Sequence, residues 1–274
     1  MLEALRPLLA SFTLDELEQR IAAYESNSAT RTDYGQIWRE LSDVVHVNRE
    51  PGFVMPAPTR PIAKGTRLYR ARRITDLSSD IERIRHAWEP KPHQARQGRL
   101  NGANEPLLYA AMSPGTAFFE ARIRVGDHFA MMEFETKSDF DIALIHDPGD
   151  VPGLDNLEQQ KLSRVFRFLE DVFTQRVEPG STHKYGAPEA VAKLFFDYPP
   201  EISSGWLYRS VADPGGLGAN LAFRPETGHE VLELLSVEVC GCESIEDSDK
   251  PVRFKRLEVF VPDHESGMLL PPHS

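Results

Sequence analysis

Three short blocks of the sequence combine strong hydrogen-bonding side chains with aromatic and small neighbours. The first ends in Arg70, the second leads to Glu120, and the third contains Ser210. A pocket for a flat, phosphorylated ligand requires such groups side by side, so we take these three residues as candidates for a site. The blocks read Leu68-Tyr69-Arg70; Gly98-Arg99-Leu-Asn101-Gly102 with Leu108-Tyr109 and Thr116-Ala-Phe-Phe-Glu120; and Trp206-Leu-Tyr208-Arg-Ser210-Val with Gly215 to Phe223.

Each of these residues also has an ordinary structural explanation. Arg70 could belong to a surface ion pair, Glu120 could lie on the solvent face of a helix, and Ser210 could be a small residue at a strand end. None of the three supports a functional conclusion alone, so the interpretation depends on their combination.

Several other kinds of chemistry lack their motifs. The nine histidines are scattered without metal-ligand spacing, and neither a P-loop nor a G-x-S-x-G turn occurs. The run Gly215 to Gly218 precedes a strand-like segment, whereas a dinucleotide fingerprint must open a helix. Hydride transfer, P-loop ATP hydrolysis and serine hydrolase chemistry are therefore disfavoured, and no metal site is predicted.

The charge of the chain is uneven. The net charge is −11, and residues 146–274 hold 12 Lys and Arg against 22 Asp and Glu. Such a chain is not expected to bind nucleic acid directly or to bind membranes, since both need a cationic surface. The arginines concentrated between Arg67 and Arg99 suit a compact anionic ligand, or alternatively form a solvated, salt-bridged face.

The elements that must position the candidates are mixed helices and strands. We expect helices within residues 1–47, with a capping box from Thr13 to Glu16, and a proline-rich linker over 48–64. Regular βαβ alternation is absent, so the chain is predicted to be α+β. Strands are expected near 66–72, 104–111, 128–135, 139–145, 206–212, 219–224, 231–239 and 254–261, and further helices from Ser113 and over 154–177 and 188–197.

The cysteines and the hydropathy indicate a cellular setting. Cys240 and Cys242 lie one residue apart, which is poor geometry for a disulfide and too few ligands for structural zinc. No run of 18 apolar residues occurs, and the start of the chain lacks the pattern of a secretory signal. A reducing, cytoplasmic location is the expectation.

Taken in order, the blocks resemble the RES domain, a family named for its Arg, Glu and Ser. The resemblance covers about residues 65–225. It implies an ADP-ribosyltransferase-like split mixed and antiparallel sheet with flanking helices, preceded here by an N-terminal helical extension and linker (1–64) ahead of the catalytic domain (65–274). It also implies the toxin half of a RES–Xre toxin–antitoxin pair that consumes NAD+ as its substrate.

Carried over by position, the resemblance implies that Arg70, Glu120 and Ser210 are catalytic. Glu120 would stabilise an oxocarbenium-like transition state, and Ser210 would bond the dinucleotide without acting as a nucleophile, because no base is placed to activate it. The implied NAD+-binding residues are Tyr69, Arg70, Arg99, Tyr109, Ser210 and Asn220. Two positions depart from the family pattern: Leu100 stands where an aromatic residue is usual, and Arg209 where proline often precedes the serine.

The group that accepts ADP-ribose from NAD+ and the partners of the protein stay open at this point. An NAD+ glycohydrolase or phosphorylase is expected first, an ADP-ribosyltransferase with a macromolecular target second, and a non-catalytic nucleotide- or partner-binding module third. The resemblance implies an Xre-type antitoxin as a partner, and a homodimer is compatible with the sequence.

Overall fold

The computed structural model describes residues 2–26, 33–45, 57–76, 80–175, 185–197, 204–245 and 252–272. The chain forms two compact units. Unit 1 contains 1–60, 96–103 and 143–203, and unit 2 contains 61–95, 104–142 and 204–274. The proline-rich segment lies outside the described residues as far as residue 56, and the end of the predicted linker forms strand β1 (Thr59–Ile62).

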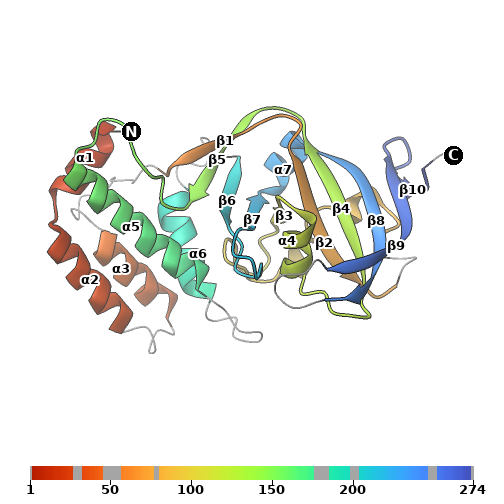
Figure 1. The fold of residues 1–274 in the computed structure, drawn as a ribbon, viewed down its shortest axis with the longest axis horizontal. Helices are drawn as coiled ribbons and strands as arrows, with labels where there is room; N and C mark the ends of the chain where they lie inside the picture. Colours follow the sequence, from red (N-terminus) through yellow and green to blue (C-terminus); the bar gives the residue numbers. More distant parts are fainter. Residues whose placement is uncertain are drawn as a thin grey trace. The chain divides into compact units, whose positions relative to one another are not determined.

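Unit 1 is helical, as Figure 1 shows. Helix α2 begins with the expected capping box: the Thr13 backbone N–H donates to Glu16 (2.8 Å), and the Glu16 N–H donates to the Thr13 hydroxyl (3.2 Å). The ring of Tyr24 on α2 meets Phe168 on α5 edge-to-face at 5.2 Å. Its helices are α1 (Leu2–Ala10), α2 (Leu14–Ser26), α3 (Tyr34–Val45), α5 (Asn156–Thr174) and α6 (Gly186–Val191), the last continued by a π-helical turn (Ala192–Phe196).

Unit 2 is built on the sheet. The strand order is β1-β5-β6-β7-β3-β2-β4-β8-β9-β10, and from β6 to β10 every neighbouring pair is antiparallel. The predicted α+β fold with a large sheet and N-terminal helices is confirmed. The strands are β2 (Arg67–Ile74), β3 (Leu108–Ala111), β4 (His128–Thr136), β5 (Phe140–Ile145), β6 (Gly205–Arg209), β7 (Ala219–Phe223), β8 (Leu232–Ser244), β9 (Arg253–Asp263) and β10 (Met268–Leu270).

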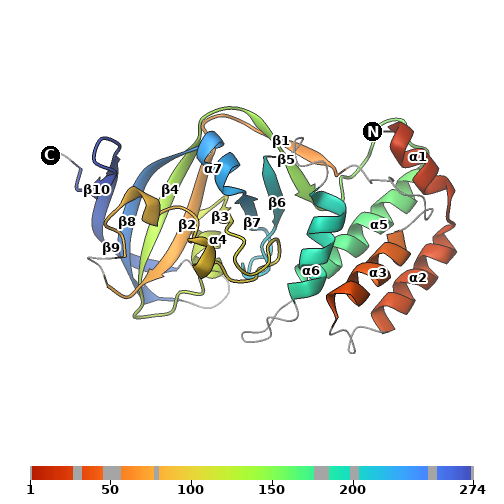
Figure 2. The same cartoon turned by 180° about the vertical axis from the view of Figure 1, so that it is seen from behind.

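Helices cover both faces of this sheet. On β3, Ala111 packs with Ala117 and Phe118 of α4 (Pro114–Glu120). Leu108 of the same strand lies three positions before Ala111 and therefore points to the other face. It lies near Gly228 of α7 (Pro225–Val231). Figure 2 shows both helices from behind. Glu120, the last residue of α4, therefore lies on the face of the sheet that α4 covers.

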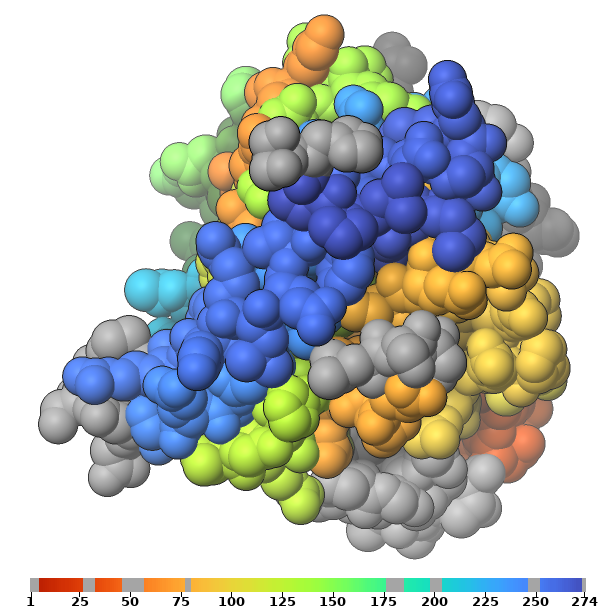
Figure 3. Space-filling view, turned by 90° about the vertical axis from the view of Figure 1, so that its right-hand side faces the viewer, coloured from red at the N-terminus to blue at the C-terminus, as the bar shows by residue number. Residues whose placement is uncertain are grey.

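The sheet is nearly split between β2 and β3. These strands share one residue pair, Tyr69 with Ala111, whereas β2 and β4 share eight. The strands therefore diverge on either side of Tyr69. At the far side of the sheet, residues of the C-terminal strands lie exposed across one face (Figure 3). Cys240 and Cys242 are free thiols buried in β8, and burial raises the pKa of Cys240 to about 11.

Candidate functional site

Helix α4 positions Glu120 at its last residue. The helix starts where the sequence predicts, because the Ser113 hydroxyl accepts the Thr116 backbone N–H at 3.1 Å and Pro114 occupies the first helical position. Ala117 and Phe118 are buried against the sheet. With that face fixed by packing, Glu120 leaves the helix at its exposed end.

One oxygen of the Glu120 carboxylate is held by hydrogen bonds. Its Oε1 accepts the Ser210 hydroxyl at 2.6 Å and the Asn220 side-chain amide at 2.6 Å. Both donors are buried, at 4% and 3% exposed, whereas Glu120 itself is exposed. No described residue donates to Oε2. The site thus presents one carboxylate oxygen to solvent while charge-assisted hydrogen bonds anchor the other.

Ser210 is fixed by its own backbone and hydroxyl. Its N–H donates to the Gly218 carbonyl at 2.8 Å, and its hydroxyl accepts the Asp213 N–H at 3.1 Å. Because the hydroxyl proton is directed to Glu120, Ser210 orients the carboxylate in this structure. The premise that no base is placed near Ser210 is wrong, because the Glu120 carboxylate lies 2.6 Å from its hydroxyl. That Ser210 does not act as a nucleophile stays a prediction.

Strand register explains why these distant residues meet. A single row across the sheet runs through Glu133, Tyr69, Ala111, Asn220 and Tyr208. Partners in a row point to the same face, which is the face that α4 covers. Tyr69 packs against the buried cluster that contains Ala117 and Phe118 of α4. Burial is the main reason that the pKa of Tyr69 is raised. Tyr109, two residues before Ala111, belongs to the same face.

Arg70 lies apart from the Glu120 cluster. As the neighbour of Tyr69 in a strand it points to the opposite face, and it donates to the Tyr109 carbonyl at 3.3 Å. Its Nε is buried and lacks a hydrogen-bond partner among the described residues. Burial, and then the charge of Arg72, lowers the Arg70 pKa to about 10, against the opposing effect of Glu89. The guanidinium therefore stays charged at neutral pH, with donor capacity left over.

Arg99 belongs to unit 1 and is engaged there. Its guanidinium donates to the carbonyls of Phe173 (2.5 Å) and Gln175 (2.9 Å), at the end of α5. These bonds satisfy carbonyls that a helix C-terminus leaves unpaired. The structure thus joins Glu120, Ser210 and Asn220. Within the described part of unit 2, it shows no hydrogen bond between these three and Arg70 or the two tyrosines.

Sequence reasoning included Thr116 in the second block without giving it a role, and it missed Asp213. The Thr116 hydroxyl donates to Asp213 Oδ2 at 2.8 Å, although 97 residues separate them. Thr116 is buried, at 2% exposed. The spacing of Thr116 and Glu120, four residues apart on one helix, was the signal that places them on one face.

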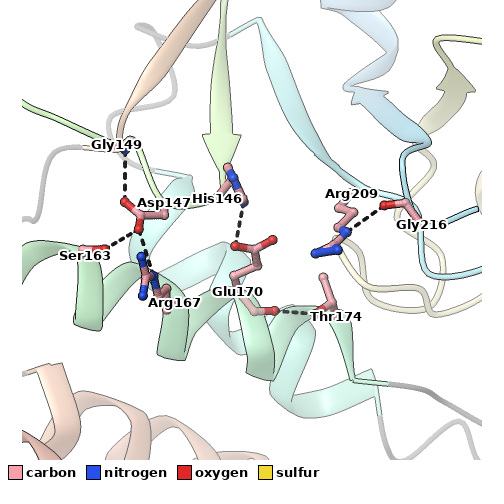
Figure 4. A network of polar contacts seen from close by, with 9 residues as sticks. All are labelled: His146, Asp147, Gly149, Ser163, Arg167, Glu170, Thr174, Arg209 and Gly216. Carbon is pink, nitrogen blue, oxygen red and sulfur yellow. Dashed lines mark hydrogen bonds and ion pairs between the residues drawn. The ribbon is translucent and has the colours of Figure 1, made fainter.

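A second polar network lies within unit 1 (Figure 4). At the end of β5, His146 Nδ1 lies 2.6 Å from Glu170 of α5, and Asp147 contacts Ser163 and Arg167 of the same helix. The network attaches the end of β5 to α5. In unit 2, the same figure shows Arg209 Nε donating to the Gly216 carbonyl at 3.0 Å.

Among the residues that the structure describes, no three His, Cys, Asp or Glu side chains gather so that they could hold a metal ion. No helix in this part of the chain has the length and apolar character needed to cross a membrane.

The fold and site define an α+β protein that presents a hydrogen-bonded carboxylate at a helix end over its sheet. The family model described as RES domain matches residues 67–239, more than half of the chain, so the protein belongs to the RES domain family. This family is associated with toxin-type proteins and with enzymes that act on NAD. A search of curated proteins found no match to this chain.

Proposed function

We propose that this protein cleaves the nicotinamide–ribose bond of NAD+, with Glu120 as the catalytic carboxylate. The observation that carries the proposal is the carboxylate itself: Ser210 and Asn220 anchor Oε1, and Oε2 is left to face a ligand. The family's association with NAD supports the choice of substrate.

The chemistry needs a fixed negative charge. As the bond breaks, nicotinamide leaves with the bonding electron pair and the ribose acquires oxocarbenium character. A carboxylate already oriented by hydrogen bonds stabilises that charge without reorganisation. Attack by water then gives ADP-ribose and a proton, whereas attack by phosphate gives ADP-ribose 1″-phosphate. Arg70, whose buried Nε has no partner among the described residues, is the proposed ligand of the dinucleotide diphosphate. Because Arg70 points to the face opposite Glu120, this role requires NAD+ to reach both faces beside the single β2–β3 pair.

The test is nicotinamide release from NAD+, measured by chromatography with and without inorganic phosphate. Release in both buffers, with ADP-ribose as product, identifies a glycohydrolase, and release only with phosphate identifies a phosphorylase. Absence of release in both overturns the proposal. Transfer of labelled ADP-ribose to macromolecules of a lysate would then favour the transferase, and stoichiometric binding without turnover would favour the binding module.

Glu120→Gln is the decisive variant. Glutamine keeps an oxygen that can accept from Ser210 and Asn220 but removes the negative charge, so we expect turnover to fall at least about a hundredfold with little change in NAD+ affinity. Glu230→Gln is the matched control, because Glu230 is an exposed glutamate on α7. Turnover near that of the control would remove Glu120 from the mechanism.

A cognate antitoxin of the Xre type is part of the proposal. Expression of the protein alone should arrest growth and deplete cellular NAD+, and co-expression with the antitoxin should restore both. The Glu120→Gln variant should be tolerated without a partner. Equal toxicity of this variant would show that toxicity does not come from NAD+ cleavage.

A further inference from the structure

Helix α4 contacts the loop between β6 and β7 at two points, one helical turn apart. Thr116 and Glu120 lie on the same face of α4, and both bond to residues of the loop 210–218. We propose that Thr116 and Asp213 are positioning residues that fix the Glu120 carboxylate through this loop. The inference rests on the proposed function, since it concerns the same carboxylate.

The hydrogen bonds form a closed circuit. Thr116 donates to Asp213 Oδ2 (2.8 Å), the Asp213 backbone N–H donates to the Ser210 hydroxyl (3.1 Å), and that hydroxyl donates to Glu120 (2.6 Å). The helix between Thr116 and Glu120 completes the circuit. Asp213 thus connects Thr116 to the Ser210 hydroxyl, and that hydroxyl orients the Glu120 carboxylate.

Asp213 is held in place from its other side as well. Its Oδ1 accepts the Gly215 N–H at 2.9 Å, which closes a tight turn. The Thr116 hydroxyl lies 2.9 Å from the Ser113 hydroxyl, so the helix N-cap joins the same group of bonds. The loop therefore adopts one conformation because several bonds converge on one carboxylate.

Gly218 shows how closely the loop fits α4. A Cβ at this position would lie 2.3 Å from Asp213 Oδ2 and 2.6 Å from the Thr116 hydroxyl. No side chain is accommodated there without displacing the Thr116–Asp213 bond. The sequence thus leaves room for this bond by keeping glycine opposite it.

Removal of the Thr116 hydroxyl should lower the turnover of NAD+. Valine preserves the shape of threonine but leaves Asp213 Oδ2 without its donor, and it releases the Ser210 hydroxyl to rotate away from Glu120. The carboxylate then loses orientation rather than charge, which affects the transition state more than ground-state binding. We expect Thr116→Val to lower kcat about tenfold with KM within about twofold.

The experiment compares Thr116→Val with Thr116→Ser and with Thr66→Val. Serine retains the hydroxyl and should restore most of the turnover. Thr66 also uses its hydroxyl locally, on the Ala63 carbonyl at 2.7 Å, but it lies in the turn before β2. Gly218→Ala should reproduce the loss seen with Thr116→Val, and Gly115→Ala, whose Cβ would meet its nearest atom at 3.9 Å, should not. Equal kcat in Thr116→Val and wild type would overturn the proposal.

Hydrogen exchange of the loop amides separates this inference from the proposed function. The Asp213 and Gly215 N–H groups should exchange faster in Thr116→Val than in Thr116→Ser, while amides of β4 stay unchanged. If the wild type releases no nicotinamide, the proposed function fails and this comparison still tests the loop attachment. Unchanged exchange in Thr116→Val would show that Thr116 does not hold the loop.

Discussion

At the scale of single residues, Arg70 is one of the side chains with a buried polar atom that has no hydrogen-bond partner in the described part of the chain. A buried guanidinium nitrogen without a partner is costly, and a phosphate oxygen would satisfy it. We expect Arg70→Ala to weaken NAD+ binding about tenfold or more, and Arg70→Lys to recover little, because lysine lacks the forked donors. Calorimetry measures both, with Arg73→Ala as control, since Arg73 lies on the same strand in an exposed ion pair with Asp127. Unchanged affinity in Arg70→Ala would exclude a role in binding phosphate.

The sequence nominated residues that lie together in the structure, while their roles stay predictions. Ser210 and Asn220 each lie within hydrogen-bond distance of Glu120. The resemblance implied that Ser210 bonds the dinucleotide, whereas in this structure its hydroxyl donates to Glu120. Asp213 escaped prediction because its bond to Thr116 depends on a loop path that no local pattern encodes. The resemblance implied that Arg99 binds NAD+, and in this structure its guanidinium donates to a carbonyl at the end of α5.

At the scale of elements, local sequence signals predicted most helices and strands, but they could not predict which strands pair with each other. The strands β4 and β5 follow each other across a short polar turn, but β4 pairs with β2 and β8, and β5 lies between β1 and β6. Hydrophobic alternation identifies a strand without naming its neighbour. The short strand β10 and helix α7 were missed, since three residues and a proline–glycine segment give weak signals.

Gly205 tests the pairing of β6 with β7, which brings Ser210 and Asn220 together. A Cβ at Gly205 would lie 2.2 Å from the Ala222 carbonyl oxygen, which is backbone and cannot move aside. We expect Gly205→Ala to lower the free energy of unfolding by about 1–3 kcal/mol or more. Gly241→Ala is the control, because its nearest neighbour is a side-chain atom at 3.8 Å. Urea unfolding compares them, and equal midpoints would mean that the strands adjust freely.

At the scale of the whole molecule, the family match and the compact units have different boundaries. The match begins at residue 67, yet unit 1 gathers 1–60 with 96–103 and 143–203. Helices α5 and α6 therefore bury apolar faces in the same unit as α1 to α3, as the contact of Tyr24 with Phe168 illustrates. The sequence located the N-terminal helices but offered no sign that later segments complete their core.

Deletion of residues 1–60 tests this organisation. Loss of three helices should expose apolar residues of α5 such as Leu162 and Phe168, which are 1% and 2% exposed in the full chain. We expect the fragment 61–274 to aggregate and to bind a hydrophobic dye, whereas the full chain does neither. A monodisperse fragment with native-like circular dichroism would show that α5 and α6 need no cover from the N-terminal helices.

The separation of the site residues along the chain also sets when the site can exist during synthesis. Glu120 is made 90 residues before Ser210 and 100 before Asn220. At about 5–20 residues per second, the ribosome takes about 5–20 s to cover that stretch. During this interval the nascent chain contains Glu120 but not yet both side chains, Ser210 and Asn220, that bond to it. A polypeptide released before residue 220 therefore lacks the Asn220 amide that bonds to Glu120.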